Sequence, residues 1–149
     1  LLKKNHIISQ LTAIFGEKIL DKNQRIDRDY LGNLVFSSMK KLSQLNHVMH
    51  PEIRQNVLAE LKQIEGDSLI VGALIEEIGL RSVCDTLMVI DSDEKYIEKR
   101  LTTKMKKILR IQKNREAYKR LADVVIVNVF DDQFSKNLCI QCDLLLNKH

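Results

Sequence analysis

The sequence has no tryptophan, and aromatic residues make up only 5% of its 149 residues. Proteins that bind single-stranded nucleic acid stack bases on aromatic side chains, and this chain has few to offer. Its charge is also nearly balanced, because 24 lysines and arginines face 20 aspartates and glutamates, which gives a net charge of +4. This small excess is spread along the expected helices and is not gathered in one tail. The composition therefore favours anionic small molecules over nucleic acid as ligands.

We expect no signal peptide, and the sequence has no apolar run near the ~18 residues of a membrane-spanning helix. It has three cysteines, Cys84, Cys139 and Cys142, which we expect to be free thiols. Free thiols are typical of proteins in reducing compartments. We therefore expect a cytoplasmic protein with no membrane partner.

Cys139 and Cys142 form a C-x-x-C pattern, which suggests a zinc or redox site. A zinc site needs a second pair of ligands, and the four histidines do not supply one at suitable spacing. The pair also lies in an apolar helical run that includes Leu138, Ile140 and Leu144. Two buried free cysteines are the favoured interpretation, and we expect no metal site there.

What the chain does contain is enough apolar sequence for one core. Hydrophobic residues account for 44% of the chain and charged residues for 30%, a balance typical of a folded domain. The chain begins Leu1-Leu2-Lys3-Lys4, without methionine. We therefore expect it to be cut from a longer polypeptide.

The first 66 residues have the pattern of a helical region. Apolar positions recur every three or four residues over 7–15, and Gly16 is placed to end that helix. Asp27 can cap the free amides of a second helix that runs to Phe36.

Two more helices are predicted before the sequence changes from helical periodicity to short apolar runs. Ser37 or Ser38 can cap a third helix that runs to about Val48. Pro51 fits the first turn of a fourth helix, because its missing N–H would have no partner there in any case.

Three short runs further along are apolar at consecutive positions, which is typical of strands covered on both faces of a parallel sheet. They are Leu69–Val71, Thr86–Ile90 and Val124–Val127. Helical patterns separate them, so we predict an α/β fold with right-handed crossovers. Residues 1–66 would form a helical region, and 67–149 the C-terminal part of an α/β core. Such a sheet normally has a nucleotide-binding strand at its centre, which would have to come from upstream.

Spaced segments of the chain match, in order, the pattern of one enzyme family. The segments are Phe15–Leu20, Ile26–Leu31, Val35–Phe36, His50–Arg54, Gly72–Glu76, Asp85–Asp91, Ile108–Gln112 and Leu121–Asn128. Together they resemble the dephospho-coenzyme A kinases, a family of P-loop kinases. The resemblance covers essentially the whole chain. It implies a P-loop kinase-like parallel sheet, a helical substrate-binding region and a lid around residues 100–120.

The departures from the family pattern concern phosphate binding and the lid. The family's opening strand, its glycine-rich loop ending in Gly-Lys-Ser/Thr and the aspartate after it are not in this sequence, and we expect them upstream. Gly72 stands where the family has proline, and Ile75 where it has an aromatic residue. The segment between Arg100 and Gln112 is shorter than usual, and Ile108 replaces a lid arginine.

The resemblance implies that cations on the lid assist phosphoryl transfer. This reaction depends on positioning and on stabilising charge, with little covalent work by the protein. Arg115 matches a family arginine and, with Arg100, is a catalytic candidate, whereas Lys113 is a nucleotide-binding candidate. The alternative is that these residues lie on the solvated face of a charged helix, as lysines and arginines usually do.

His50, Pro51 and Arg54 are substrate-binding candidates, because the family's His-Pro pair opens a helix beside the acceptor substrate. Free amides at a helix start attract an anion, and an arginine one turn later adds a fork for phosphate. The alternative is a structural histidine at a helix cap.

Glu76 is also a substrate-binding candidate, because it matches the glutamate of the family's Pro-Leu-Leu-Phe-Glu motif. Glu76 and Glu77 point about 100° apart on a helix, so they do not form an acid–base pair.

Two polar residues follow predicted strands. Asp91 lies at the edge where α/β sheets bind ligands, although capping of the next helix explains it equally well. Asn128 follows the last strand and is a nucleotide-binding candidate near the adenine.

The resemblance implies a kinase that moves the γ-phosphoryl group of ATP to the 3′-hydroxyl of dephospho-coenzyme A, as a monomer or weak homo-oligomer. Magnesium would be held mainly by residues upstream, and the residues present are expected to be inactive by themselves. The alternative is a non-catalytic family member that binds coenzyme A or a protein partner. A different P-loop nucleotide kinase is a third interpretation, which the His-Pro and Phe-Gly-x-x-Ile-Leu segments together make less favoured.

Overall fold

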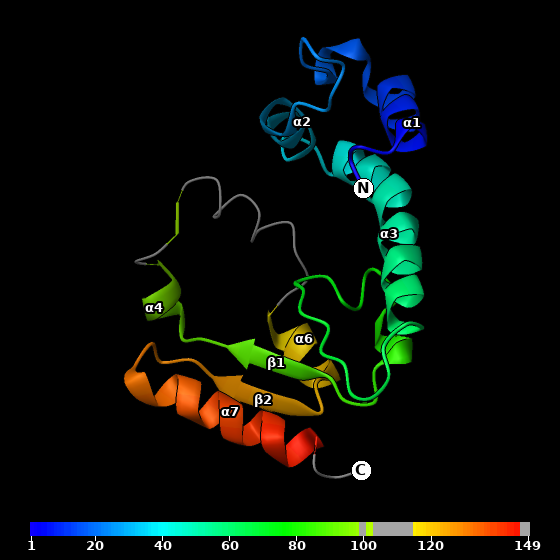
Figure 1. Ribbon diagram of the computed structural model, residues 1–149. Helices are drawn as coiled ribbons and strands as arrows, with labels where there is room; N and C mark the ends of the chain where they lie inside the picture. The colour runs from blue at the N-terminus through cyan, green and yellow to red at the C-terminus, as the bar shows by residue number, and fades with distance from the viewer. Residues whose placement is uncertain (99–100, 103–114, 147–149) are drawn as a thin grey trace. The chain divides into compact units, whose positions relative to one another are not determined.

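The computed structural model describes residues 1–98, 101–102 and 115–146, and Figure 1 shows the path of the chain. The chain divides into two compact units, Leu1–Leu80 and Arg81–His149. The first unit is helical and the second is α/β. The functional boundary that we expected between residues 66 and 67 stays a prediction.

The first unit begins with two helices whose ends follow local sequence signals. Helix α1 spans Asn5–Phe15 and ends at Gly16, whose φ of 83° lies in the region that favours glycine. A short 3₁₀ turn, η1, follows at Glu17–Ile19. Helix α2 spans Arg28–Val35, and the Asp27 side chain accepts hydrogen bonds from the first free amides of this helix. Both predicted helices are confirmed.

An apolar core holds the first unit together. Its buried side chains come from α1, η1, the segment after η1, and α2: Ile7, Leu11, Ile19, Ile26, Leu31 and Val35. Side chains from the first half of the next helix pack against this core, among them Leu42, Leu45, Val48 and Met49. Burial of these groups away from water supplies the main stabilisation of the unit.

A single helix, α3, replaces the two helices predicted after Ser38. It spans Met39–Leu61 and contains Pro51, so the predicted helix start at Pro51 is wrong. Proline in a helix interior removes one backbone hydrogen bond and crowds the preceding turn. The helix nevertheless continues, because the packing of Val48 and Met49 on the core already fixes the backbone direction as far as the proline.

Two parallel strands form the sheet of the second unit (Figure 1). Strand β1 spans Met88–Asp91 and β2 spans Val124–Val127, with the first and last residues of each strand opposite one another. Two of the three predicted strands are therefore confirmed. Their faces are less covered than expected among the described residues, since Ile90 remains 52% exposed and Val127 54% exposed.

The third predicted strand, at Leu69–Val71, is wrong. These residues form neither helix nor strand, and Leu69 and Val71 are 80% and 87% exposed. A strand exists only where a neighbour bonds its amides and carbonyls. In the described part of the chain the sheet contains β1 and β2 alone, so this apolar run has no strand beside it.

The described part of the second unit also contains four helical segments. They are η2 at Arg81–Val83, α4 at Glu94–Glu98, α6 at Arg115–Leu121 and α7 at Asp132–Leu146. Figure 1 shows α7 running alongside β2. No helix within the described ranges combines the length and hydropathy that a membrane span requires.

Asp123 fixes the amino ends of both strands. Its Oδ2 accepts hydrogen bonds from the Leu87 amide at 2.7 Å and from Nη2 of Arg81 at 3.0 Å. Its own amide donates to the Leu87 carbonyl at 2.9 Å. One residue thus joins the segments that enter β1 and β2, which gives a structural reason for the aspartate in the Leu121–Asn128 segment.

The position of Pro51 inside α3 leads to the first prediction. Pro51→Ala restores the missing amide, and we expect the free energy of unfolding to rise by about 2 kcal/mol. This figure is a helix-interior penalty of about 3 kcal/mol less about 1 kcal/mol for the freer unfolded chain. Urea denaturation measures it. Ser43→Ala, at an exposed position of the same helix, is the control and should change stability by less than about 0.5 kcal/mol. A Pro51→Ala protein of unchanged or lower stability would contradict a continuous α3.

Candidate functional site

Glu76 lies on a single helical turn at residues 74–80. The turn closes with two hydrogen bonds, from the Gly79 amide to the Glu76 carbonyl and from the Leu80 amide to the Ile75 carbonyl, both at 2.9 Å. This pair of bonds is the Schellman end of a helix, and the φ of 75° at Gly79 is the left-handed conformation that it requires. Ile75 and Leu80 are buried, so the apolar contact that accompanies such ends anchors the turn.

Two side chains one turn apart on α3 bind this turn. Nδ1 of His50 lies 3.1 Å from the Glu77 carbonyl, so it carries the hydrogen and donates. Nε of Arg54 donates to the Gly79 carbonyl at 3.2 Å. The last carbonyls of a helical turn lack helical partners, and cationic or polar side chains satisfy them well. The free amides that we expected at a helix start beside His50 and Pro51 are not available, because both residues lie within α3. Substrate binding by these two residues stays a prediction.

His50 and Arg54 still keep polar atoms for a ligand. Nε2 of His50 is buried and has no hydrogen-bond partner among the described residues. In the neutral ring, with Nδ1–H committed to Glu77, this nitrogen is an acceptor. Arg54 uses only Nε for its hydrogen bond to Gly79, so its terminal nitrogens remain as donors in the part of the chain that the structure describes. Glu76 is half-buried on the turn that these two residues hold.

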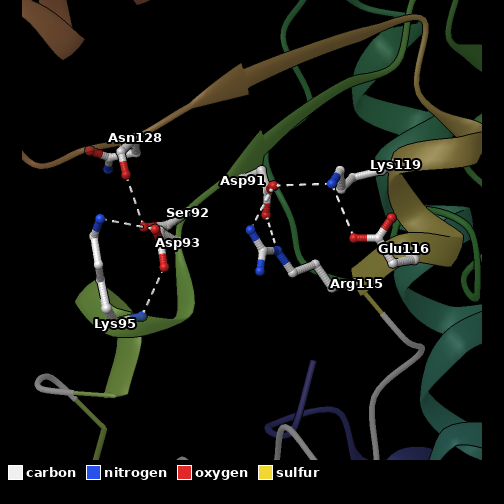
Figure 2. A network of polar contacts seen from close by, with 8 residues as sticks. All are labelled: Asp91, Ser92, Asp93, Lys95, Arg115, Glu116, Lys119 and Asn128. Carbon is white, nitrogen blue, oxygen red and sulfur yellow. Dashed lines mark hydrogen bonds and ion pairs between the residues drawn. The ribbon is translucent and has the colours of Figure 1, made fainter.

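A buried carboxylate dominates the carboxyl edge of the sheet in the second unit (Figure 2). Asp91, the last residue of β1, is only 7% exposed. Arg115, the first residue of α6, donates through Nε to Oδ1 and through Nη2 to Oδ2, the latter at 2.9 Å. Nζ of Lys119 lies 3.6 Å from Oδ2 and also binds Glu116 at 3.0 Å. Because an isolated buried charge is strongly destabilising, these cations are what allow Asp91 to remain ionised.

The ionisation of Asp91 follows from these contacts. The hydrogen bonds from Arg115 hold the pKa of Asp91 below its usual range, against burial, which raises it. The same contact raises the pKa of Arg115. Asp91 is thus a carboxylate at neutral pH and a poor general base, because a proton acceptor works best with a pKa near the operating pH.

Asp91 does not cap the following helix, so that alternative is wrong. Asp93 takes this position, and its Oδ1 accepts from the Lys95 amide at 3.1 Å. The side chain of Asp91 is thus left for Arg115 and Lys119.

Asn128 lies beside Asp91 at the same edge. Its amide donates to the Asp91 carbonyl at 2.7 Å, and its carbonyl accepts from the Ser92 hydroxyl at 2.9 Å (Figure 2). The Asn128 side-chain oxygen accepts from the Phe130 amide at 2.8 Å. The side-chain oxygen therefore stabilises the turn that follows β2. The contact of Asn128 with adenine stays a prediction.

The structure brings the candidates together in two groups. His50, Arg54 and Glu76 meet around the 74–80 turn, and Arg115 lies with Asn128 at the sheet edge. Arg100 and Lys113, with most of the predicted lid, lie outside the described residues.

Sequence reasoning missed Lys119 as a partner of Asp91. The signal that could have indicated a cation was Asp91 itself, since a carboxylate that ends a buried strand needs one.

The cysteines form no disulfide and no metal cluster within the described residues. Cys139 is exposed and Cys142 is half-buried, so the expectation of two buried thiols is wrong. Burial raises the pKa of Cys84, so its thiol is a weak nucleophile. No three side chains of His, Cys, Asp or Glu gather as metal ligands within the described ranges.

The ion pair predicts how Asp91 titrates. Its pKa should lie below the ordinary value of about 3.9, and Arg115→Ala should raise it. Because the folded-state pKa is depressed, the pair stabilises the fold fully above about pH 4 to 5 and loses this effect as the pH falls through the folded-state value. Carboxyl carbon NMR against pH measures the titration of Asp91 in the unmutated protein and in Arg115→Ala. A pKa of Asp91 that Arg115→Ala leaves unchanged would contradict the pairing.

Comparison with known proteins shows which family the chain resembles. The family model described as dephospho-CoA kinase matches residues 2–132. The dephospho-CoA kinase of Fusobacterium nucleatum is 34% identical over 145 residues, which cover 90% of this chain and 75% of that protein. That of Borrelia garinii is 32% identical over 133 residues, covering 83% of this chain and 65% of the relative. The chain thus spans about two thirds to three quarters of the length of these relatives. The chain belongs to the dephospho-CoA kinase family.

Proposed function

We propose that the full-length gene product transfers the γ-phosphoryl group of ATP to the 3′-hydroxyl of dephospho-coenzyme A. The observation that carries this proposal is the family match over residues 2–132. The relatives of this chain bear the name of that enzyme, and the name itself states the acceptor. The comparisons do not favour the alternative of a non-catalytic member that only binds coenzyme A or a protein partner.

The cations at the sheet edge support phosphoryl transfer. Ligands of α/β proteins bind outside the carboxyl ends of the strands, where Asp91 presents Arg115 and Lys119. The side chain of Arg115 is 37% exposed, so part of it is accessible from solvent. We assign Arg115 to the charge that spreads over the transferring group, because preorganised donors act mainly on the transition state.

The 74–80 turn supports an acceptor site in the first unit. Arg54 holds the turn through Nε and keeps its terminal nitrogens for a phosphate of the acceptor. The buried Nε2 of His50 is an acceptor that a substrate hydroxyl or a water molecule can satisfy. Glu76 is assigned to the same site, with its position set by these two side chains.

Several parts of the proposal rest on the family alone. Magnesium is expected as the ion that accompanies ATP, but the described residues include no cluster that fits it, so no step is assigned to the metal. A cytoplasmic location and a monomeric or weakly associated state also remain predictions.

The activity is tested together with Arg115. Purified full-length gene product should convert dephospho-coenzyme A and ATP to coenzyme A and ADP, with coenzyme A identified by mass. Arg115→Ala should lower kcat by about 100-fold with little change in KM, because the cation acts on charge that develops in the transition state.

Arg120→Ala is the matched control, because it removes the same charge from an exposed position of the same helix. It should leave kcat within about twofold of the unmutated protein, since surface substitutions have small effects. An unmutated protein without activity overturns the proposed function. An active protein in which Arg115→Ala is silent overturns only the role of Arg115.

Arg54 gives a separate prediction for the acceptor. Loss of a charge-assisted hydrogen bond weakens binding by about 1.5–3 kcal/mol, so Arg54→Ala should raise the Kd for dephospho-coenzyme A by about 10- to 100-fold. The Kd for ATP should change little. Calorimetric titration of each ligand, beside a melting curve, makes the measurement, and Arg28→Ala at an exposed position of α2 is the control. Equal weakening for both ligands with a lowered Tm would mean that Arg54 only holds the turn.

A further inference from the structure

We propose that Asp91 is a positioning residue that orients Arg115 for phosphoryl transfer. The proposal rests on the proposed function and goes beyond it, because it assigns a task to a carboxylate that touches no substrate. Its basis is the contact between the end of β1 and the start of α6 that Figure 2 shows.

The first argument is the geometry of the contact. Two hydrogen bonds run from one edge of the Arg115 guanidinium, Nε and Nη2, to the two oxygens of Asp91. A single bond would leave the planar group free to swing, whereas a two-bond fork fixes both its position and its plane. The remaining Nη1 points away from the carboxylate by the planar geometry of the group. Asp91 therefore sets the direction in which Arg115 offers its other donors.

The second argument is the difference in accessibility between the partners. Asp91 is 7% exposed, whereas the side chain of Arg115 is 37% exposed. The carboxylate is thus enclosed at the end of a strand, which is a rigid element, while part of the Arg115 side chain remains accessible. A functional group held in this way needs little reorganisation when the substrate arrives.

A second carboxylate–arginine pair in the same unit supplies the matched comparison. Asp123 binds Arg81 at the amino ends of the strands, the opposite end from Asp91. Its other partner is a backbone amide, that of Leu87. The two pairs share their chemistry, but only the Asp91 pair lies at the edge where α/β sheets bind ligands.

The experiment is a double-mutant cycle in the full-length gene product. We compare kcat and KM for the unmutated protein, Asp91→Asn, Arg115→Ala and the double variant. Asp91→Asn should lower kcat by about 10- to 100-fold with little change in KM, because the Arg115 guanidinium would no longer be held in position. The double variant should be no slower than Arg115→Ala alone, because Asp91 acts through Arg115. Asp123→Asn should lower the Tm while kcat of the folded protein stays unchanged.

Arg115→Lys keeps the experiment decisive if Asp91→Asn does not fold. Lysine keeps the charge but cannot form the fork, so kcat should fall nearly as far as in Arg115→Ala. Wild-type kcat in Arg115→Lys, or in folded Asp91→Asn, overturns the positioning role and leaves the proposed function standing. A higher kcat in Asp91→Asn also overturns it, since Asp91 would then be withholding Arg115 from the substrate. An inactive unmutated protein overturns the proposed function, and the positioning role with it.

Discussion

The buried carboxylate of Asp91 requires cations beside it, and much of the second unit is arranged around this requirement. An ion removed from water loses solvation that only close, well-aligned partners replace. Arg115 and Lys119 supply these partners from positions four residues apart, which lie on one face of a helix. The face that α6 turns toward β1 is therefore dictated by one residue at the end of the strand. Because this edge is where α/β sheets bind ligands, the same requirement places two cationic side chains at the candidate site.

In the first unit it is backbone carbonyls that require polar partners. The 74–80 turn ends with carbonyls that no helical amide reaches, and His50 and Arg54 satisfy two of them from α3. The spacing of one helical turn places both side chains within reach of the 74–80 turn, and it requires no helix start at Pro51. Each side chain also has two tasks, to hold this turn and to bind a ligand, which the sequence pattern does not distinguish. Nδ1 of His50 and Nε of Arg54 hold the structure, while Nε2 of His50 and the terminal nitrogens of Arg54 remain for a ligand.

Local signals in the sequence predicted most of the elements. Gly16 and Asp27 mark helix ends correctly, because a cap depends on atoms only a few residues away. The same reasoning failed at Pro51, where packing of the preceding residues on the core carries the helix through the proline. It failed again at Leu69–Val71, because an apolar run becomes a strand only beside a partner strand. Strand pairing is a long-range event that the run itself does not encode.

The sequence by itself determined the family, through ordered motifs along the whole chain, and the α/β class, through the alternation of apolar runs with helical patterns. It also indicated Arg115 and the pair His50 and Arg54 as functional candidates. Only the tertiary structure decided that Arg115 binds Asp91, since any of the chain's 24 lysines and arginines satisfies the charge rule. The physical reason is that charge is a property of a residue, whereas a two-bond fork depends on where the fold places a strand end and a helix start.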